Sequence, residues 1–248
     1  MSDADREQPF ISHLIELRTR LLRIVWGVLL VFVALSPFSN PIYSALAIPL
    51  TRQSKLIAID VLSPFLTPLK FTLILAVFIT VPWTLYQIWA FVAPGLYHRE
   101  KRMVLPILIS STLLFYCGMA FAYFVIMPVF FAFLSGTAPQ DVAVMTDINR
   151  YLDFVMMLFF AFGVAFEVPV ATVILSLAGI LSPDAMAAKR SYVIVGAFVI
   201  GMLLMPDVIS QTMLAIPMWL LFEAGVFVSR LLLRRRDAAR ATASTEES

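Results

Sequence analysis

Two glutamates stand among basic residues at the borders of long apolar runs. Glu16 lies within residues 13–18, His-Leu-Ile-Glu-Leu-Arg, and Glu100 lies within residues 97–102, Tyr-His-Arg-Glu-Lys-Arg. A carboxylate accepts two parallel hydrogen bonds from one guanidinium group, so two such acids could bind two arginines of a cationic peptide. Each acid also has a simpler explanation. Glu16 could pair with Arg20 one helical turn later, and Glu100 could be neutralised by the bases around it.

Two further polar positions lie inside apolar sequence. Glu167 occurs in Phe-Glu-Val-Pro at residues 166–169. An ionised carboxyl in apolar surroundings is costly unless it is paired, so we expect Glu167 to face a cavity or a partner. Residues 207–212 include an Asp, a Ser, a Gln and a Thr. They could cap the start of a helix, or they could form a polar strip on which a partner helix docks.

The remaining reactive side chains predict structural roles. Cys117 is the one cysteine, which rules out a disulfide within the chain, and we expect it to be a small buried apolar residue. Glu223 is expected to pair with Arg230 two turns later or to extend toward the membrane surface. The sequence contains no His-Glu-x-x-His, Gly-x-Ser-x-Gly or phosphate-loop motif. We therefore expect no catalytic residues, no metal and no cofactor.

The elements that must position these residues are long runs without charge. No Asp, Glu, Lys or Arg occurs in residues 24–51, 71–98 or 103–140. A helix crosses a bilayer with about 20 mainly apolar residues. The chain is 61% hydrophobic and 14% charged, whereas a soluble chain carries roughly 25% charged residues. These observations predict an all-α polytopic membrane protein and leave no room for a separate soluble domain.

We expect six transmembrane helices, with the last two short. The predicted spans cover residues 21–36, 69–93, 104–134, 151–178, 192–205 and 208–228. The apolar run 192–205 would be about 21 Å long as a helix, which is less than the ~30 Å of a bilayer core. Prolines at 82, 106, 128 and 217 predict kinks within the spans. Kinked and tilted helices tend to enclose a concave, cupped surface.

The distribution of Lys and Arg predicts the orientation. Fourteen of the 18 basic residues lie in the N-terminal segment, in the second-to-third and fourth-to-fifth connections, or after the last span. Both termini are therefore predicted to be cytoplasmic. We divide the chain into an amphipathic N-terminal arm at 1–20, a six-helix transmembrane domain at 21–230 and a flexible basic-to-polar tail at 231–248.

The order of several motifs resembles the TatC family, the polytopic core subunit of the bacterial twin-arginine protein translocase. The similarity extends over residues 9–230. It depends on the residues around Glu16 and on the following motifs: Ser-Pro-Phe at 63–65, Tyr-Gln-Ile-Trp-Ala-Phe-Val-Ala-Pro-Gly-Leu-Tyr at 86–97, Glu-Lys-Arg at 100–102, Gly-Met-Ala-Phe-Ala-Tyr-Phe at 118–124, Phe-Gly-Val-Ala-Phe-Glu-Val-Pro at 162–169 and Pro-Asp-Val-Ile-Ser-Gln-Thr at 206–212.

The resemblance implies a cupped six-helix protein without enzymatic activity that recognises the Arg-Arg signal peptides of folded cargo on its cytoplasmic face. The residues it assigns to signal-peptide binding are Glu16, Arg18, Phe91, Glu100, Lys101 and Arg102. It makes Glu167 the buried acid of the concave face. It places the docking of partner helices at Met202, Met205, Asp207 and Gln211.

The resemblance also implies partners and a location. The implied partners are the single-helix proteins TatA and TatB, other copies of the same chain and the lipid bilayer, with no nucleic acid. Export would use the proton motive force across the bacterial cytoplasmic (inner) membrane. The hairpin tip at 204–207, Leu-Met-Pro-Asp, departs from the family's pattern of a Thr and two prolines before the Asp. The tip is one residue shorter and lacks the Thr hydroxyl, which bears on docking at Met205 and not on the signal-peptide site.

Two other functions stay open from the residues alone. One is a proton-coupled transporter of small solutes that uses Glu167. It would need an alternating cavity and usually an internal repeat, and no repeat is visible in the sequence. The other is a purely structural membrane subunit whose acids are all paired.

Overall fold

The computed structural model describes residues 3–44, 56–57, 62–92, 101–137, 146–204 and 208–246. Within these ranges nearly every residue is helical, which confirms the all-α prediction. The exception in this part of the chain is a short parallel pair, β1 (Leu56–Ile57) beside β2 (Thr146–Asp147). The chain forms two compact units, the first comprising Met1–Tyr97 with Gln140–Met156 and the second comprising His98–Pro139 with Met157–Ser248.

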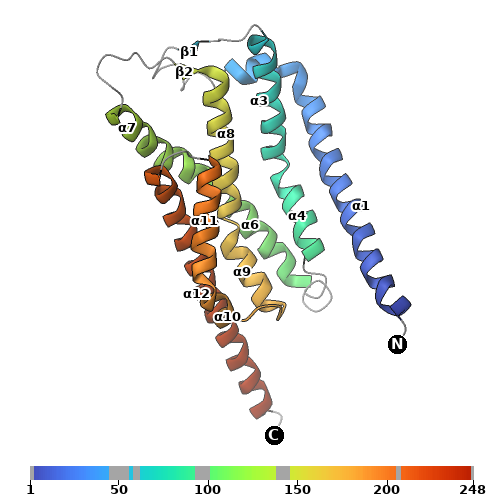
Figure 1. The fold of residues 1–248 in the computed structure, drawn as a ribbon. Helices are drawn as coiled ribbons and strands as arrows, with labels where there is room; N and C mark the ends of the chain where they lie inside the picture. The colour runs from blue at the N-terminus through green and yellow to red at the C-terminus, as the bar shows by residue number, and fades with distance from the viewer. Residues whose placement is uncertain are drawn as a thin grey trace. The chain divides into compact units, whose positions relative to one another are not determined.

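The first unit is built on α1 (Asp3–Leu35), which packs along α3 (Ser63–Ile79) and α4 (Val81–Val92), as Figure 1 shows. A short 3-10 turn, η1 (Ser36–Phe38), follows α1. The axes of α3 and α4 differ by 51°. The bend lies directly before Pro82, whose ring clashes with the preceding turn of a straight helix. The kink predicted at Pro82 is therefore confirmed.

The start of α8 (Ile148–Ala165) completes the first unit. Lys70 on α3 forms an ion pair with Asp153 on α8, and the Thr67 hydroxyl donates a hydrogen bond to the Asn149 side chain. Both side chains of the ion pair are about half exposed. These two contacts fix the rotation of α3 against α8.

The second unit begins with one long apolar segment in three parts. These parts are α6 (Lys101–Phe121), a single π-helical turn η2 (Ala122–Ile126) and α7 (Met127–Thr137). After α8 come four more helices, of which α12 packs against α9 and α11 (Figure 1): α9 (Val168–Leu177), α10 (Pro183–Ala188), α11 (Arg190–Leu204) and α12 (Val208–Glu246). A buried cluster of Met186, Phe222 and Val226 joins α10 to α12.

Glycines allow the helices of the second unit to approach closely. A Cβ atom at Gly118 on α6 would collide with the backbone oxygen of Phe162 on α8. A Cβ atom at Gly225 on α12 would lie 2.7 Å from the Cα atom of Pro169 on α9. Small residues at such crossings are common between membrane helices, where van der Waals packing replaces the hydrophobic effect.

Several described helices are long and apolar enough to cross a bilayer. Four single segments satisfy this test, and the bent pair α3 and α4 makes a fifth if it counts as one span: His13–Ser44, Leu105–Phe133, Asn149–Leu177 and Gln211–Arg234. At 1.5 Å per residue, α11 is only about 22 Å long, so the helix expected between residues 192 and 205 is short as predicted. The total of six spans and the cupped arrangement stay predictions.

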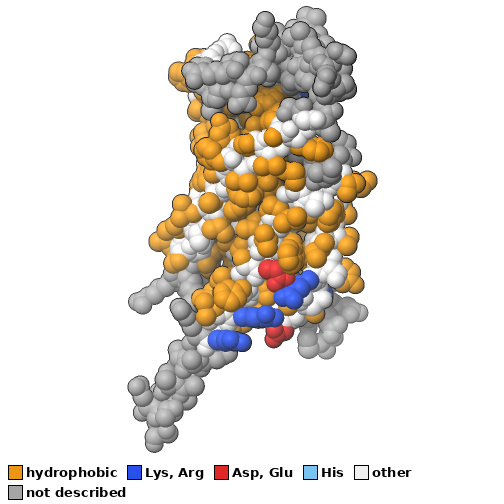
Figure 2. Space-filling view, turned by 90° about the vertical axis from the view of Figure 1, so that its left-hand side faces the viewer, with side chains coloured by type: hydrophobic (Ala, Val, Ile, Leu, Met, Phe, Trp, Pro, Cys, Tyr) orange, Lys and Arg blue, Asp and Glu red, His pale blue; other side chains and the backbone are white. Residues whose placement is uncertain are grey.

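Many large apolar side chains of the described residues are exposed. Trp26, Leu30 and Phe124 are among the exposed large residues, and in Figure 2 the charged side chains gather near one end of an otherwise apolar face. Cys117 is exposed on α6, so the prediction that it is buried was wrong. The reason is that a membrane helix turns apolar side chains outward toward lipid as well as inward, and a run of apolar residues does not distinguish the two directions.

The ends of the chain are helical where they are described. Helix α1 continues without interruption through residue 20, and α12 continues as far as Glu246 through residues that we expected to form a flexible tail. The division of the chain at residues 20 and 230 stays a prediction.

Candidate functional site

Glu16 lies in the N-terminal half of α1 and is paired with a residue of the same helix. The Arg20 guanidinium donates two hydrogen bonds to Glu16 Oε1, from Nε at 2.8 Å and from Nη2 at 2.6 Å. The side chain of Glu16 is 39% exposed and that of Arg20 is 19% exposed. The pairing with Arg20 that the spacing predicted is confirmed. It leaves Glu16 Oε2 without a donor among the described residues.

An aromatic contact lies beside this pair. The His13 and Phe91 rings are stacked with their centroids 4.3 Å apart and an angle of 14° between their planes. His13 is one turn before Glu16 on α1, and Phe91 is at the end of α4. The structure therefore brings Phe91 to the same part of α1 as Glu16, through a stacking contact with His13 that the sequence did not predict.

Two further contacts fix α4 against α1. The Trp83 indole nitrogen donates a hydrogen bond of 3.2 Å to the backbone oxygen of Arg23, and Gly27 gives the indole room, because a Cβ atom there would lie 3.0 Å from Trp83 Cδ1. Gln87, whose side chain is only 1% exposed, accepts a hydrogen bond of 3.4 Å from Arg20 Nη1. Sequence reasoning missed Gln87, and its one available signal was an amide in an apolar helix.

The other residues predicted to bind a signal peptide are placed less completely. Arg18 is exposed on α1. Glu100 lies outside the described residues, and Lys101 and Arg102 form the first turn of α6. The proposed pairing of Glu16 with Glu100 at one site therefore stays a prediction.

Glu167 occupies the break between α8 and α9. Pro169 stands at the start of α9 and ends the regular hydrogen bonding of α8, so the chain turns at residues 166–167. The Glu167 side chain is only 9% exposed, and its Oε2 accepts a hydrogen bond from the hydroxyl of Ser111 on α6. Its Oε1 has no donor among the described residues. The expectation that Glu167 has a polar partner is confirmed for one of its oxygens.

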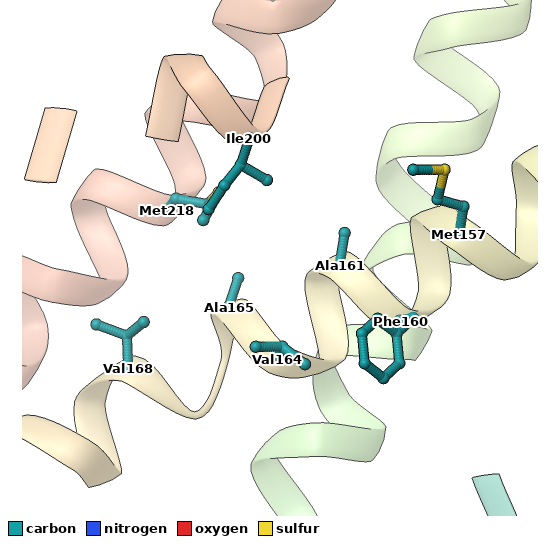
Figure 3. Close-up of a pocket in the computed structure, with 8 residues that line it drawn as sticks. All are labelled: Met157, Phe160, Ala161, Val164, Ala165, Val168, Ile200 and Met218. Carbon is teal, nitrogen blue, oxygen red and sulfur yellow. The ribbon is translucent and has the colours of Figure 1, made fainter. Parts of the chain in front are cut away.

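An apolar pocket of about 320 Å³ lies near this break. Figure 3 shows the side chains of Ala161, Ala165 and Val168 on one wall and those of Ile200 and Met218 on the other. Met157, Phe160 and Val164 complete the lining, so helices α8, α9, α11 and α12 all contribute.

Two of the four predicted docking residues can be placed. Met202 is 71% exposed on α11. Gly201 packs closely against Gln211, since a Cβ atom at Gly201 would lie 3.3 Å from Gln211 Cα, and this contact holds the end of α11 beside the start of α12. Met205 and Asp207 lie outside the described residues.

Ion pairs join α12 to α11 and to α10. Arg190 Nη2 donates a hydrogen bond of 2.9 Å to Glu223 Oε2, and Arg230 Nη2 donates one of 2.9 Å to Asp184 Oδ1. The predicted pairing of Glu223 with Arg230 was therefore wrong. The packing of α11 on α12 brings Arg190 to Glu223, and two turns of a single helix place Arg230 out of reach.

The side chains at these sites are suited to binding other molecules through ionic, aromatic and apolar contacts. The described residues contain no group of three His, Cys, Asp or Glu side chains that could hold a metal ion. The Glu16 carboxylate can accept a cation, the His13–Phe91 stack offers an aromatic surface, and the exposed faces of α11 and α12 can contact another helix.

Comparison with known proteins identifies relatives over nearly the whole chain. The family model described as "Sec-independent protein translocase protein (TatC)" matches residues 12–217. The protein of that name from Haemophilus influenzae is 54% identical, and the match covers 100% of this chain and 98% of the relative. The protein of the same name from Escherichia coli strain K12 is 58% identical, with 90% of this chain and 88% of the relative covered.

A solved structure agrees with the sequence relatives. The crystal structure of a twin arginine translocase receptor, TatC, is similar to this chain with a TM-score of 0.79 and 38% sequence identity. The superposition covers 88% of this chain and 98% of the solved one.

Proposed function

The chain belongs to the TatC family of Sec-independent protein translocases, and we propose that the Glu16 end of α1 binds the Arg-Arg motif of a signal peptide. The protein is a multi-pass membrane protein and a core subunit of the twin-arginine translocation system. It is a transport component. The binding step, the residues that carry it and the partners are our proposal.

The observation that supports this proposal is the state of the Glu16 carboxylate. Its Oε1 is held by Arg20, its Oε2 is open among the described residues, and the side chain is 39% exposed. Hydrogen bonds between a carboxylate and a guanidinium are charge-assisted and about twice as strong as neutral ones. A partly shielded carboxylate is therefore a suitable receptor for an arginine.

Other residues are proposed to complete this site. Phe91, stacked on His13, offers an apolar and aromatic surface for the part of the peptide that follows the arginines. Glu100 is proposed to bind the second guanidinium, with Arg18, Lys101 and Arg102 orienting the acids. From the excess of Lys and Arg on one predicted side, we infer that this site and both termini lie on the cytoplasmic face of the bacterial inner membrane.

The partner surface is proposed on the hairpin of α11 and α12. Met202 is highly exposed in the apolar part of α11, and Gln211 supplies an amide at the start of α12. Interhelical contacts in membranes favour such a combination of apolar and polar side chains. TatA and TatB are proposed to dock here, near Met205 and Asp207, and to support export of folded cargo driven by the proton motive force.

A direct test is peptide binding to the purified chain in lipid nanodiscs. A fluorescent Arg-Arg signal peptide should bind wild type and should lose about tenfold in affinity or more with Glu16→Gln, which keeps the shape and removes the charge. Asp153→Asn is the matched control, because it removes an acid from another ion pair of the same unit. Equal affinity of Glu16→Gln and wild type would contradict the proposal.

A further inference from the structure

We propose that Arg20 is a built-in competitor for the incoming arginine: it occupies Glu16 in the resting protein and moves to Gln87 when a signal peptide binds. This inference rests on the proposed function, in which Glu16 binds a guanidinium of the peptide. It concerns three residues of the first unit, Glu16 and Arg20 on α1 and Gln87 on α4.

The competition follows from which oxygen Arg20 uses. Both of its short hydrogen bonds end on Glu16 Oε1, from Nε and from Nη2. A bidentate guanidinium–carboxylate pair uses both carboxylate oxygens. An arginine of the peptide can reach Oε2 at once, but it obtains its second bond only when Arg20 releases Oε1. Arg20 therefore opposes the bidentate contact and does not oppose a single one.

Gln87 is an alternative hydrogen-bond acceptor for the displaced Arg20 guanidinium. Its side-chain oxygen already accepts a hydrogen bond from Arg20 Nη1 at 3.4 Å, which is at the long end of the range for such bonds. Arg20 is only 19% exposed, so losing Glu16 without another acceptor would leave a poorly hydrated charge. A shorter contact with the buried Gln87 amide offsets part of that loss. With Glu16 and Gln87 as alternative acceptors, the Arg20 side chain can adopt two positions whose populations a bound peptide shifts.

Arg20 also acts differently on Arg-Arg and Lys-Lys peptides. An ammonium group is a point charge that does not match both carboxylate oxygens in the way a planar guanidinium does. A lysine therefore gains less by displacing Arg20 from Oε1. A lysine leaves Arg20 in place and uses Oε2 alone, so Arg20 lowers the affinity for an arginine more than the affinity for a lysine.

The test measures binding of Arg-Arg and Lys-Lys peptides to the full chain in nanodiscs. We expect Arg20→Gln to tighten binding of the Arg-Arg peptide about five- to tenfold, because its bidentate contact no longer has to displace a charge-assisted pair, and that of the Lys-Lys peptide about twofold. Arg23→Gln is the matched control. It removes the same charge from an exposed side chain one turn later, and it should change both affinities by the same small factor.

Two further variants separate competition from mere support of the fold. Gln87→Met removes the alternative acceptor and should weaken the Arg-Arg peptide about threefold in the wild-type background, but should have no effect in the Arg20→Gln background. Arg20→Lys keeps the charge and loses the planar fork, and it should give an intermediate discrimination. If Arg20→Gln does not yield a folded protein, Arg20→Lys and Gln87→Met still carry the test.

Each outcome decides between the two claims. If wild type binds the two peptides equally, or if Glu16→Gln leaves binding unchanged, the proposed function fails and this inference fails with it. If wild type prefers the Arg-Arg peptide and depends on Glu16, but Arg20→Gln weakens binding or leaves the discrimination unchanged, only the inference is overturned. In that case Arg20 orients Glu16 and does not compete for it.

Discussion

Gly225 offers the sharpest test of how the second unit is packed. A Cβ atom at this position would lie 2.7 Å from Pro169 Cα, whereas ordinary contact begins at 3.4 Å, so α9 and α12 must separate by about 0.7 Å. It would also collide with the Thr172 hydroxyl, which donates a hydrogen bond of 2.8 Å to the Pro169 oxygen. The backbone of Pro169 cannot move aside as a flexible side chain would.

The expected size of the effect follows from two opposing terms. Overpacking of a well-packed contact destabilises by about 1–3 kcal/mol. Replacing Gly by Ala inside a helix stabilises by up to about 1 kcal/mol. Because the obstacle is backbone, we expect the overpacking term to lie in the upper half of its range. Gly225→Ala should therefore lower the free energy of unfolding by about 1–2 kcal/mol in total.

The assay is reversible unfolding by SDS in mixed micelles, followed by far-ultraviolet circular dichroism. Gly196→Ala on α11 is the matched control, because no atom lies within 4 Å of a Cβ built at Gly196. That variant should be neutral or more stable than wild type by up to about 1 kcal/mol. Equal stability of Gly225→Ala and Gly196→Ala would refute the close approach of α9 and α12.

Two other predictions concern polar contacts between helices. Ser111→Ala removes the hydroxyl that donates a hydrogen bond to Glu167 and should destabilise the protein by about 1–3 kcal/mol in the same unfolding assay, because the buried carboxyl loses a partner. The control is Ser110→Ala, which should change stability little, because among the described residues the Ser110 hydroxyl bonds only to Ile107 of its own helix. Equal effects of the two variants would contradict the hydrogen bond between Ser111 and Glu167. The coupling energy between Lys70 and Asp153, measured by a double-mutant cycle, should be below about 1 kcal/mol because both side chains are half exposed. A value above about 2 kcal/mol would contradict this prediction and show that the pair is shielded in the membrane.

The sequence predicted those features that depend on residues close together in the chain. The pairing of Glu16 with Arg20 follows from their spacing of one helical turn, and the bend before Pro82 follows from the geometry of proline. The fold class followed from the charge-free runs, since only a helix satisfies its backbone alone inside a bilayer.

Contacts between distant segments could not be predicted in this way. Gln87 lies 67 residues from Arg20, and Ser111 lies 56 residues from Glu167. Which side chains meet depends on the rotation and height of each helix, and in an apolar chain the pattern of hydrophobic residues fixes neither, because both the lipid-facing and the protein-facing sides are apolar. The pairing of Glu223 was predicted wrongly for this reason.

The central claim is that the Glu16 end of α1, with Phe91 beside it, receives the arginines of a signal peptide. A photoreactive amino acid at position 91, with Glu16 intact, tests it most directly by crosslinking to an Arg-Arg precursor and to its Lys-Lys variant. The same probe at Trp26, which is exposed further along α1, serves as the control position. We predict strong adducts from position 91 with the Arg-Arg precursor, weak adducts with the Lys-Lys variant and loss of both with Glu16→Gln. Adducts of equal strength from positions 91 and 26, or adducts that persist in Glu16→Gln, would contradict the claim.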